Sequence, residues 1–260
     1  MNFFADLTTG NATPSQQIIL AVDTSSRVTS LAVAQGEKLL RSSEELHEEK
    51  RSETLWSEVQ SLLEGLGKTI NDVEVFGVCT GPGGFTGLRV GISAVKGFSA
   101  ATNKPIVGVT SLEAAAIAAS VEGPVCVMVN AYKGEVYSQL FSIDGDTLPQ
   151  QRNEPMVSRY REALERVADL NELTIAGDAV ETGKEIIQEF VSSHRNLKWM
   201  LKESTPELAV AIAKLAYLRS SGGEFNSADT LKASYVRPSE AEIKLSLGLL
   251  GSKIKRSMRS

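Results

Sequence analysis

The chain has few of the residues from which metal centres and disulfide frameworks are built. It contains two cysteines and two histidines among 260 residues. Cys79 and Cys126 each lie inside an apolar run typical of a strand, which indicates small core residues in a reducing compartment rather than a bridge. His47 and His194 have no spacing to each other, to cysteine or to aspartate that indicates a ligand set. We therefore expect no metal site.

Long apolar runs are also lacking. No stretch approaches the ~18 residues that a membrane span requires, so we expect no membrane contact. Residues 1–17 have no basic region followed by an apolar core, which argues against a secretory signal and favours a flexible N-terminal extension. Together with the cysteine usage, these features predict a cytoplasmic protein.

Positive charge is scarce over most of the sequence. The formal net charge is −5, which argues against non-specific binding of nucleic acid through the whole surface. After Glu242, however, five basic residues and no acids follow. We interpret residues 252–260 as a solvated basic tail, and contact of that tail with phosphates is the alternative.

Several familiar catalytic motifs are missing. No Gly-x-Ser-x-Gly elbow offers a serine nucleophile. The glycine-rich run after Cys79 is not a dinucleotide fingerprint, because Thr86 stands where the third glycine is required, and it lacks the Lys-Ser/Thr of a Walker A loop. A near miss at Gly67-Lys68-Thr69 has Leu62 in place of the required first glycine. The residues give weak support for an active site belonging to this chain alone.

The chain does have a glycine-rich turn between a predicted strand and a predicted helix. The run CTGPGGFTGLRVGISAVKGFSAA extends from Cys79 to Ala101, directly after the apolar stretch VEVFGVC. In such a turn, backbone N–H groups approach an anion or another chain without a Cβ in the way. The turn is therefore either a phosphate site or a packing surface.

The order of the predicted elements repeats in two halves. In the first, antiparallel strands from Ile18 precede a helix at Arg51–Leu66, a strand at Val73–Cys79 and a helix from Thr86. After Gly123-Pro124, a second pair of strands is again followed by helix, strand and helix. Halves that begin with a hairpin predict an α/β fold of two tandem actin-like, ribonuclease-H-type lobes with mixed sheets, whereas a Rossmann domain would begin with parallel strands.

We place the two lobes at residues 18–110 and 111–238. The second range includes a helix expected at Pro206–Ser220. A C-terminal helix at 239–251 is expected to pack back on the first lobe.

The two helices of the first lobe predict a subunit interface. Arg51–Leu66 has an apolar stripe that is wide for one contact, and the next helix has Gly87 and Gly91 at i, i+4. Glycine inside a helix costs about 1 kcal/mol against alanine, so the pair indicates close approach of another helix. A purely internal core is the alternative, and under the interface hypothesis Gly91→Leu abolishes dimerisation without unfolding the lobe. The predicted interface residues are Leu55, Trp56, Val59, Leu62, Gly87, Arg89, Gly91, Ile92 and Val95.

A weak phosphate contact is predicted beside the glycine turn. Asp23-Thr24-Ser25-Ser26 ends the first strand, where actin-like ATPases place a carboxylate near metal and a backbone hairpin around phosphates. Those hairpins usually have glycine where this chain has Ser25, whose Cβ hinders backbone approach. The residues concerned are Asp23, Thr24, Gly83 and Gly84, and the alternative is that Asp23 caps the turn.

Five segments between about Ile18 and Glu242 carry a family resemblance. They are ILAVDTSS, GVCTGPGGFTGLRVGISAVKG, PIVGVTSLEA, KGEVY and YVRPSEAE, in that order. The chain resembles the TsaB (YeaZ) family, and the segment from Gly81 to Gly97 is highly specific. The resemblance implies a non-catalytic scaffold that binds and activates the threonylcarbamoyltransferase TsaD, which forms N6-threonylcarbamoyladenosine at tRNA position 37.

The same resemblance implies partners and cofactors. The expected partners are a TsaD-like catalytic subunit, a TsaE-like ATPase and, when the chain is alone, a second copy; tRNA is contacted only indirectly. No cofactor of its own is implied, although ATP or ADP at the junction of the complex is compatible with it. The alternative function is a stand-alone actin-like ATPase or small-molecule kinase.

The catalytic paralogue has a similar glycine loop and must be distinguished. It has two metal-binding histidines four residues apart, just after the strand that matches Pro105–Val109. Ser111 and Ala115 stand at about those positions here, and neither can hold a metal.

The chain departs from its own family's pattern at Arg51-Ser52, at Asn130-Ala131-Tyr132 and at Gly177-Asp178-Ala179.

Overall fold

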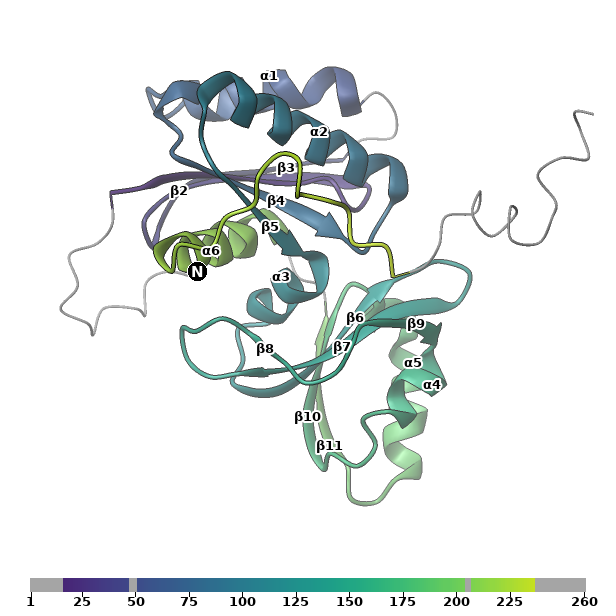
Figure 1. The fold of residues 1–260 in the computed structure, drawn as a ribbon. Helices are drawn as coiled ribbons and strands as arrows, with labels where there is room; N and C mark the ends of the chain where they lie inside the picture. The colour runs from purple at the N-terminus through teal and green to yellow at the C-terminus, as the bar shows by residue number, and fades with distance from the viewer. Residues whose placement is uncertain (1–15, 47–50, 204–206, 237–260) are drawn as a thin grey trace, which may run out of the picture.

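The computed structural model describes residues 16–46, 51–203 and 207–236, which form two lobes with one mixed sheet each (Figure 1). This is the two-lobed α/β architecture that the order of the elements predicts. The predicted N-terminal extension up to residue 15, the helix at 239–251 and the tail at 252–260 lie outside the described residues.

The first lobe is built on a five-stranded sheet with the order β3-β2-β1-β4-β5. Adjacent pairs among β1, β2 and β3 are antiparallel, whereas β4 pairs in parallel with both β1 and β5. Two helices, α1 and α2, cover one face of this sheet (Figure 1). The bounds are β1 (Ile18–Asp23), β2 (Val28–Gln35), β3 (Lys38–Leu46), α1 (Arg51–Glu64), the 3₁₀ turn η1 (Ile70–Asp72), β4 (Val75–Gly81), α2 (Phe85–Thr102) and β5 (Ile106–Thr110).

The second lobe repeats the hairpin-first order. Its sheet has the order β11-β10-β6-β7-β8, with β9 also paired to β7. The strands β8, β9 and β11 are not predicted from the sequence, because each is short or lies at an edge. The bounds are β6 (Gly123–Asn130), β7 (Glu135–Ile143), β8 (Gln150–Gln151), β9 (Met156–Arg159), α4 (Tyr160–Glu165), β10 (Glu172–Gly177), α5 (Ala179–Ser193) and β11 (Lys198–Glu203).

Two helices fill the space between the sheets, and one of them corrects the predicted division of the chain. α6 (Leu208–Ser221), expected in the second lobe, packs on the first sheet and on α3 (Ser111–Ala118). α6 is apolar around most of its circumference, so it needs cover on more than one side. Gly77 in β4 permits the close approach, since a Cβ there would lie 3.1 Å from Ile212 Cγ2. A buried ion pair of 2.5 Å between Arg219 and Glu113 joins α6 to α3.

The chain after α6 also belongs with the first lobe. Asn226 donates its backbone N–H to Ile106 O at 2.7 Å, and Ser234 donates to Thr80 O at 2.7 Å. Leu231 is buried in the apolar cluster beneath α1 and α2. Residues 208–236 therefore return to the lobe in which the chain began, and the expected second-lobe range of 111–238 is too long.

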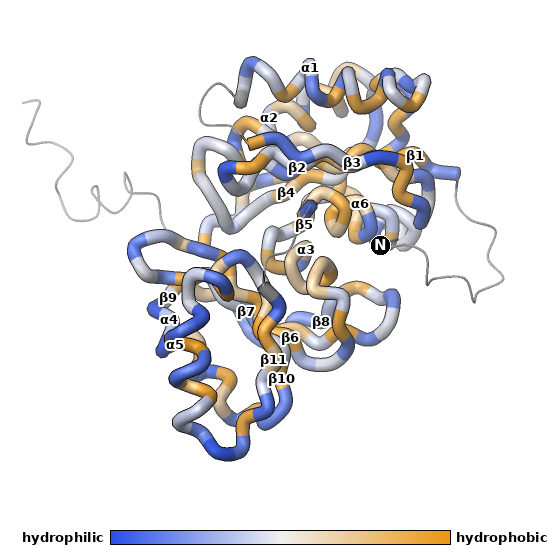
Figure 2. The backbone as a smooth tube through the Cα atoms, turned by 180° about the vertical axis from the view of Figure 1, so that it is seen from behind, coloured by the Kyte–Doolittle hydropathy of each residue, from blue (hydrophilic) through white to orange (hydrophobic). Residues whose placement is uncertain are grey.

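Hydrophobic residues lie along the strands and in the helices between the sheets, whereas α1 alternates between hydrophobic and hydrophilic residues (Figure 2). Among the described residues, no helix has both the length and the apolar character to cross a membrane.

Candidate functional site

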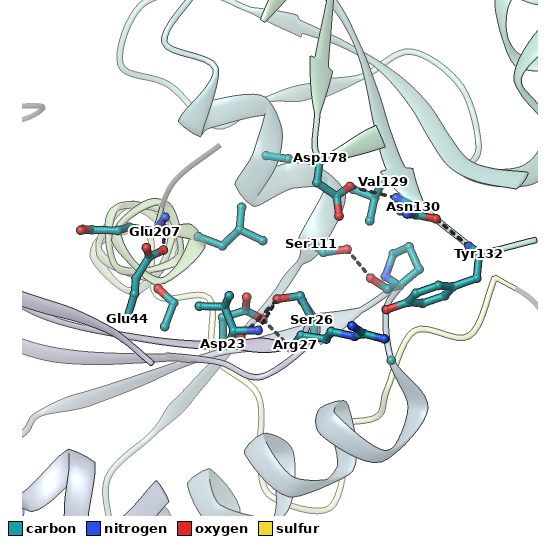
Figure 3. Close-up of a pocket in the computed structure, with 18 residues that line it drawn as sticks. Asp23, Ser26, Arg27, Glu44, Ser111, Val129, Asn130, Tyr132, Asp178 and Glu207 are labelled. Atoms are coloured by element: carbon teal, nitrogen blue, oxygen red, sulfur yellow. Dashed lines mark hydrogen bonds between the residues drawn. The ribbon is translucent and has the colours of Figure 1, made fainter. Parts of the chain in front are cut away.

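A cavity of about 540 Å³ lies between the lobes, where β1, β4 and β10 end (Figure 3). The first lobe contributes the turn after β1 and the glycine loop after β4, and the second contributes Asn130, Tyr132 and Asp178. The sequence predicts a phosphate contact at this position. Whether a phosphate can bind depends on whether the backbone N–H groups of the two loops are available to it.

The turn after β1 and the glycine loop are hydrogen-bonded to each other. Gly84 donates its N–H to Ser25 O at 2.6 Å, and Thr24 Oγ1 donates to Gly87 O at 2.7 Å. A Cβ added to Gly83 would lie 2.6 Å from the same Ser25 oxygen, so the glycine is needed for contact within the chain. The predicted phosphate residues are thus brought together, but the backbone N–H of Gly84 is already used by a protein acceptor.

Asp23 is buried at the end of β1, where its Oδ1 accepts the Ser25 N–H at 2.9 Å. This bond is the turn cap that the sequence offers as the alternative to a metal-directed carboxylate. Cys79 lies nearby, and burial raises the pKa of its thiol, with the Asp23 charge adding to the effect. Cys79 is therefore a core residue, as expected.

The charge of the cavity lining opposes a polyphosphate. Among the described residues that line it, the acids are Asp23, Glu44, Asp178 and Glu207, and the basic residue is Arg27. Like charges at short distances in a partly buried cavity repel strongly. A nucleotide there would face these carboxylates and would need a divalent cation between them and its phosphates.

Ser111 and Ala115 both line the cavity from α3. Ser111 Oγ donates to the carbonyl of Pro82 at 2.6 Å and so fixes the glycine loop to α3. Within the described ranges, no three His, Cys, Asp or Glu side chains are grouped so that they could hold a metal ion. The positions that correspond to the catalytic paralogue's histidines therefore serve packing and loop anchoring here.

Asp178 follows β10 at the N-cap position of α5, and its Oδ1 accepts the backbone N–H of Asn130 at 2.9 Å. Asn130 Oδ1 in turn accepts the Tyr132 N–H at 2.7 Å. Burial raises the pKa of Asp178, and the Asp23 charge contributes in the same direction. Two of the three segments that depart from the family pattern thus meet in one hydrogen-bonded group on the second lobe.

The Asp178 pKa predicts a pH dependence of stability. Because the folded pKa lies above the ordinary 3.8, the folded state binds more protons between the two values, and stability falls as pH rises through that interval. We expect Asp178→Asn to remove this fall, because the amide oxygen can still accept the Asn130 N–H. Urea unfolding at a series of pH values from about 2 to 7 measures the difference.

Asp72→Asn is the matched control of opposite sign. Hydrogen bonds from Thr69 lower the Asp72 pKa. The stability that Asp72 adds to the folded state is therefore present above pH 3.8 and is lost as pH falls through the folded pKa. A wild-type slope that persists in Asp178→Asn would contradict the role given to burial.

A second cavity, of about 630 Å³, lies on the outer surface between α1 and α2. We call it the α1–α2 groove. Trp56 and Phe85 are its exposed aromatic residues, with 46% and 38% of their surfaces accessible. The Trp56 ring centroid lies 5.5 Å from that of Phe98, and the Arg89 guanidinium lies 3.8 Å from the centre of the Phe85 ring. The lining residues are Ser52, Leu55, Trp56, Phe85, Thr86, Arg89, Val90, Ser93, Ala94 and Phe98.

The structure divides the predicted interface residues other than the two glycines into two groups. Trp56 and Arg89 are exposed in the groove. Five others are buried in the core of the first lobe, namely Leu55, Val59, Leu62, Ile92 and Val95. Leu55 also contributes to the floor of the groove.

Gly87 and Gly91 are not available to a partner helix, which corrects the reason given for them. Both are buried, Gly87 O accepts the Thr24 hydroxyl, and a Cβ on Gly91 would lie 2.3 Å from Thr24 Oγ1. The close approach that the glycines permit is therefore internal.

Phe85 and Val90 are groove residues that the sequence analysis missed. An aromatic residue at the first position of a helix, directly after a glycine loop, could have indicated that Phe85 is exposed.

Comparisons with known proteins give consistent matches. The model of the family described as "TsaD: tRNA N6-adenosine threonylcarbamoyltransferase" matches residues 44–245. A tRNA N6-adenosine threonylcarbamoyltransferase of Solidesulfovibrio magneticus is 41% identical over 63 residues, which are 24% of this chain and 17% of that protein. The tRNA threonylcarbamoyladenosine biosynthesis protein TsaB of Bacillus subtilis is 29% identical over 133 residues, which are 51% of this chain and 58% of that protein. The chain thus spans less than two thirds of either relative.

A solved structure shares the fold. It is that of a Pseudomonas aeruginosa protein described as similar to the peptidase YeaZ, with a TM-score of 0.71 and 24% sequence identity. The match covers 85% of this chain and 100% of the other. At this level of identity, the likeness establishes the arrangement of the two lobes.

Proposed function

Because this chain belongs to the tRNA N6-adenosine threonylcarbamoyltransferase family, whose model matches residues 44–245, we propose that it acts in forming N6-threonylcarbamoyladenosine in tRNA as a non-catalytic subunit. In this role it binds and activates a TsaD-like catalytic subunit, which carries out the transfer at position 37. When that subunit is absent, the chain pairs with a second copy of itself.

The observation that carries the proposal is the pair Ser111 and Ala115. The catalytic paralogue needs two histidines on one helix face at these positions, whereas Ser111 Oγ donates to Pro82 O and Ala115 has no ligating atom. The hydrogen bond between Gly84 and Ser25 adds to this argument, because it occupies a backbone N–H that a phosphate would require. Both features favour a chain that binds a partner through its outer surface and carries out no reaction in its inter-lobe cavity.

The α1–α2 groove is the surface that we assign to the partner subunit and to the second copy. It combines exposed aromatic rings with the Arg89 guanidinium, and aromatic residues and arginine are enriched where protein interfaces bind most strongly. The five buried residues of the predicted set support the groove from beneath. Leu55 reaches both the core and the groove, so the two helices present a firm surface.

In this proposal, nucleotide and further partners bind only after the two subunits have formed a complex. ATP or ADP binds at the junction of the two subunits, and a TsaE-like ATPase joins there. Transfer RNA is bound by the catalytic subunit, so this chain contacts it only indirectly. The charge of the inter-lobe cavity supports this division, since its carboxylates oppose a phosphate that brings no metal ion.

Calorimetric titration with ATP tests the proposal against the alternative of a stand-alone ATPase or small-molecule kinase. We expect no binding to the isolated chain, and binding to its mixture with a TsaD-like subunit that exceeds binding to the catalytic subunit alone. Asp23→Ala should leave the mixture's ATP affinity unchanged, because Asp23 caps its own turn. Micromolar ATP binding and turnover by the isolated chain, lost in Asp23→Ala, would establish the kinase instead.

A further inference from the structure

Arg89 is the charged residue of the α1–α2 groove, and an aromatic ring of the same helix holds it in place. Phe85 and Arg89 lie one turn apart on α2, and the Arg89 guanidinium carbon is 3.8 Å from the centre of the Phe85 ring. The Phe85 ring centroid in turn lies 5.3 Å from that of Tyr235. The residue before Tyr235, Ser234, donates its backbone N–H to Thr80 O at 2.7 Å. Contact with a ring that is itself packed reduces the freedom that the guanidinium would lose on binding.

The guanidinium has no carboxylate beside it in the part of the chain that the structure describes. Ion pairs among the described residues lie elsewhere, and Arg89 contacts the Phe85 ring instead. Arg89 is also exposed. A cation–π contact leaves the net charge of a guanidinium unbalanced, and the group has five N–H donors. The donors of Arg89 are therefore available to an acceptor from outside the chain.

The rest of the groove lining carries no charge. Apart from Arg89, the described residues that line it are apolar, aromatic or hydroxyl-bearing, and none of them is an acid. The groove therefore favours an occupant with an apolar surface and one carboxylate opposite Arg89. A carboxylate can accept two parallel N–H bonds from a guanidinium, which adds geometric specificity to the charge pairing.

A second copy of the chain does not meet this requirement through the groove itself. A two-fold symmetric pair presents the same patch from both subunits. Each Arg89 would then lose its water against a lining that has no carboxylate, and burial of an unpaired charge is costly. A partner of different sequence can supply the missing acid.

We propose that Arg89 pairs with a carboxylate of the catalytic subunit and so selects that subunit over a second copy of this chain. The selection rests on the proposed function of the groove. It adds the chemistry that the partner's surface must have, which is an apolar strip with one acid opposite Arg89. Because selectivity is the difference between two affinities, both associations have to be measured.

Arg89→Met tests the pairing, because methionine retains apolar contact with Phe85 and removes the charge. Calorimetry with a TsaD-like subunit should show binding weakened about 10- to 100-fold, as expected for a lost charged hydrogen bond. Sedimentation velocity should show self-association no weaker than that of the wild type, since the symmetric pair loses no carboxylate contact. Added potassium chloride should weaken subunit binding more in the wild type than in Arg89→Met.

Arg195→Met is the matched control. Arg195 is an exposed arginine of the other lobe, so its replacement changes the net charge equally and leaves the groove intact. Both associations and the salt dependence should match those of the wild type. Arg89→Lys keeps the charge but loses the planar fork of donors, so it should recover part of the affinity that Arg89→Met loses.

The outcomes separate this inference from the proposed function. If Arg89→Met binds the TsaD-like subunit as tightly as the wild type does, the inference is overturned and the docking role of the groove stands. The same holds if both associations weaken equally with unchanged salt dependence, because Arg89 would then serve packing alone. If the wild-type chain binds no TsaD-like subunit at any salt concentration, the proposed function is overturned, and the selection with it.

Discussion

Trp56→Glu is expected to weaken both self-association and binding of a TsaD-like subunit strongly while the chain stays folded. Trp56 is 46% exposed in the α1–α2 groove, so its indole is available to a partner. A buried tryptophan at the centre of an interface typically contributes about 2–4 kcal/mol, and a carboxylate in its place adds a desolvation cost. A loss of 2–4 kcal/mol corresponds to affinity weakened by about 30- to 1000-fold. Sedimentation velocity measures the self-association, and calorimetry measures binding of the catalytic subunit.

Met200→Glu serves as the control for this substitution. Met200 is another large apolar residue with most of its surface exposed, but it lies on β11 at the edge of the other lobe. The change from apolar to acidic is the same, so the variant should associate as the wild type does. If Trp56→Glu keeps wild-type affinity, the groove is not the docking surface, whatever Met200→Glu does.

The arrangement of the lobes could be predicted because it follows from local order. Strand pairs joined by short turns, then helix, strand and helix, occur twice, and the resemblance to the TsaB family agrees with the matches to B. subtilis TsaB and to the family model. The side of the sheet on which α6 packs could not be predicted. A helix that is apolar around its circumference gives no single buried face, so its sequence does not say which sheet it covers.

The inter-lobe site was predicted in part. The sequence identifies Ser25 as an obstacle to phosphate through its Cβ, whereas the structure adds its carbonyl oxygen, which accepts the Gly84 N–H. A carbonyl's direction depends on backbone angles that residue type does not fix. The hydrogen bond between Gly84 and Ser25 therefore could not be predicted from the sequence. The meeting of Asn130 and Asp178 is also a tertiary result, because 48 residues separate them in the chain.

The glycine pair of α2 shows a further limit of sequence spacing. Spacing at i, i+4 correctly places Gly87 and Gly91 on one side of a helix and indicates a close neighbour. It does not identify that neighbour, which is Thr24 of the same chain rather than another subunit. The wide stripe on α1 has a similar origin, since Leu55, Val59 and Leu62 fill the core. What remains for a partner is the narrower strip that includes Trp56 and Arg89.

Gly91→Leu is therefore expected to destabilise the first lobe rather than only to prevent dimerisation. The first added carbon would lie 2.3 Å from Thr24 Oγ1, whose hydroxyl donates to Gly87 O. Overpacking costs about 1–3 kcal/mol, and loss of the buried hydrogen bond adds about 1–3 kcal/mol. The helix propensity gained by replacing glycine offsets less than about 1 kcal/mol of this. Urea unfolding should show a lower midpoint for Gly91→Leu, and a smaller loss in the same direction for Gly91→Ala.

Two further comparisons, Gly97→Ala and Gly91→Ala in a Thr24→Ala background, make this test specific to the contact with Thr24. Gly97 lies on the same helix with no atom within 4 Å of an added Cβ, so alanine there should stabilise by roughly 0.5–1 kcal/mol. In a Thr24→Ala background the obstructing hydroxyl is gone and the remaining contact to the Thr24 Cβ is 3.5 Å, so Gly91→Ala should cost little. That coupling between positions 24 and 91 is the signature of an internal contact. A Gly91→Leu variant as stable as the wild type but unable to dimerise would return the glycine to the subunit interface.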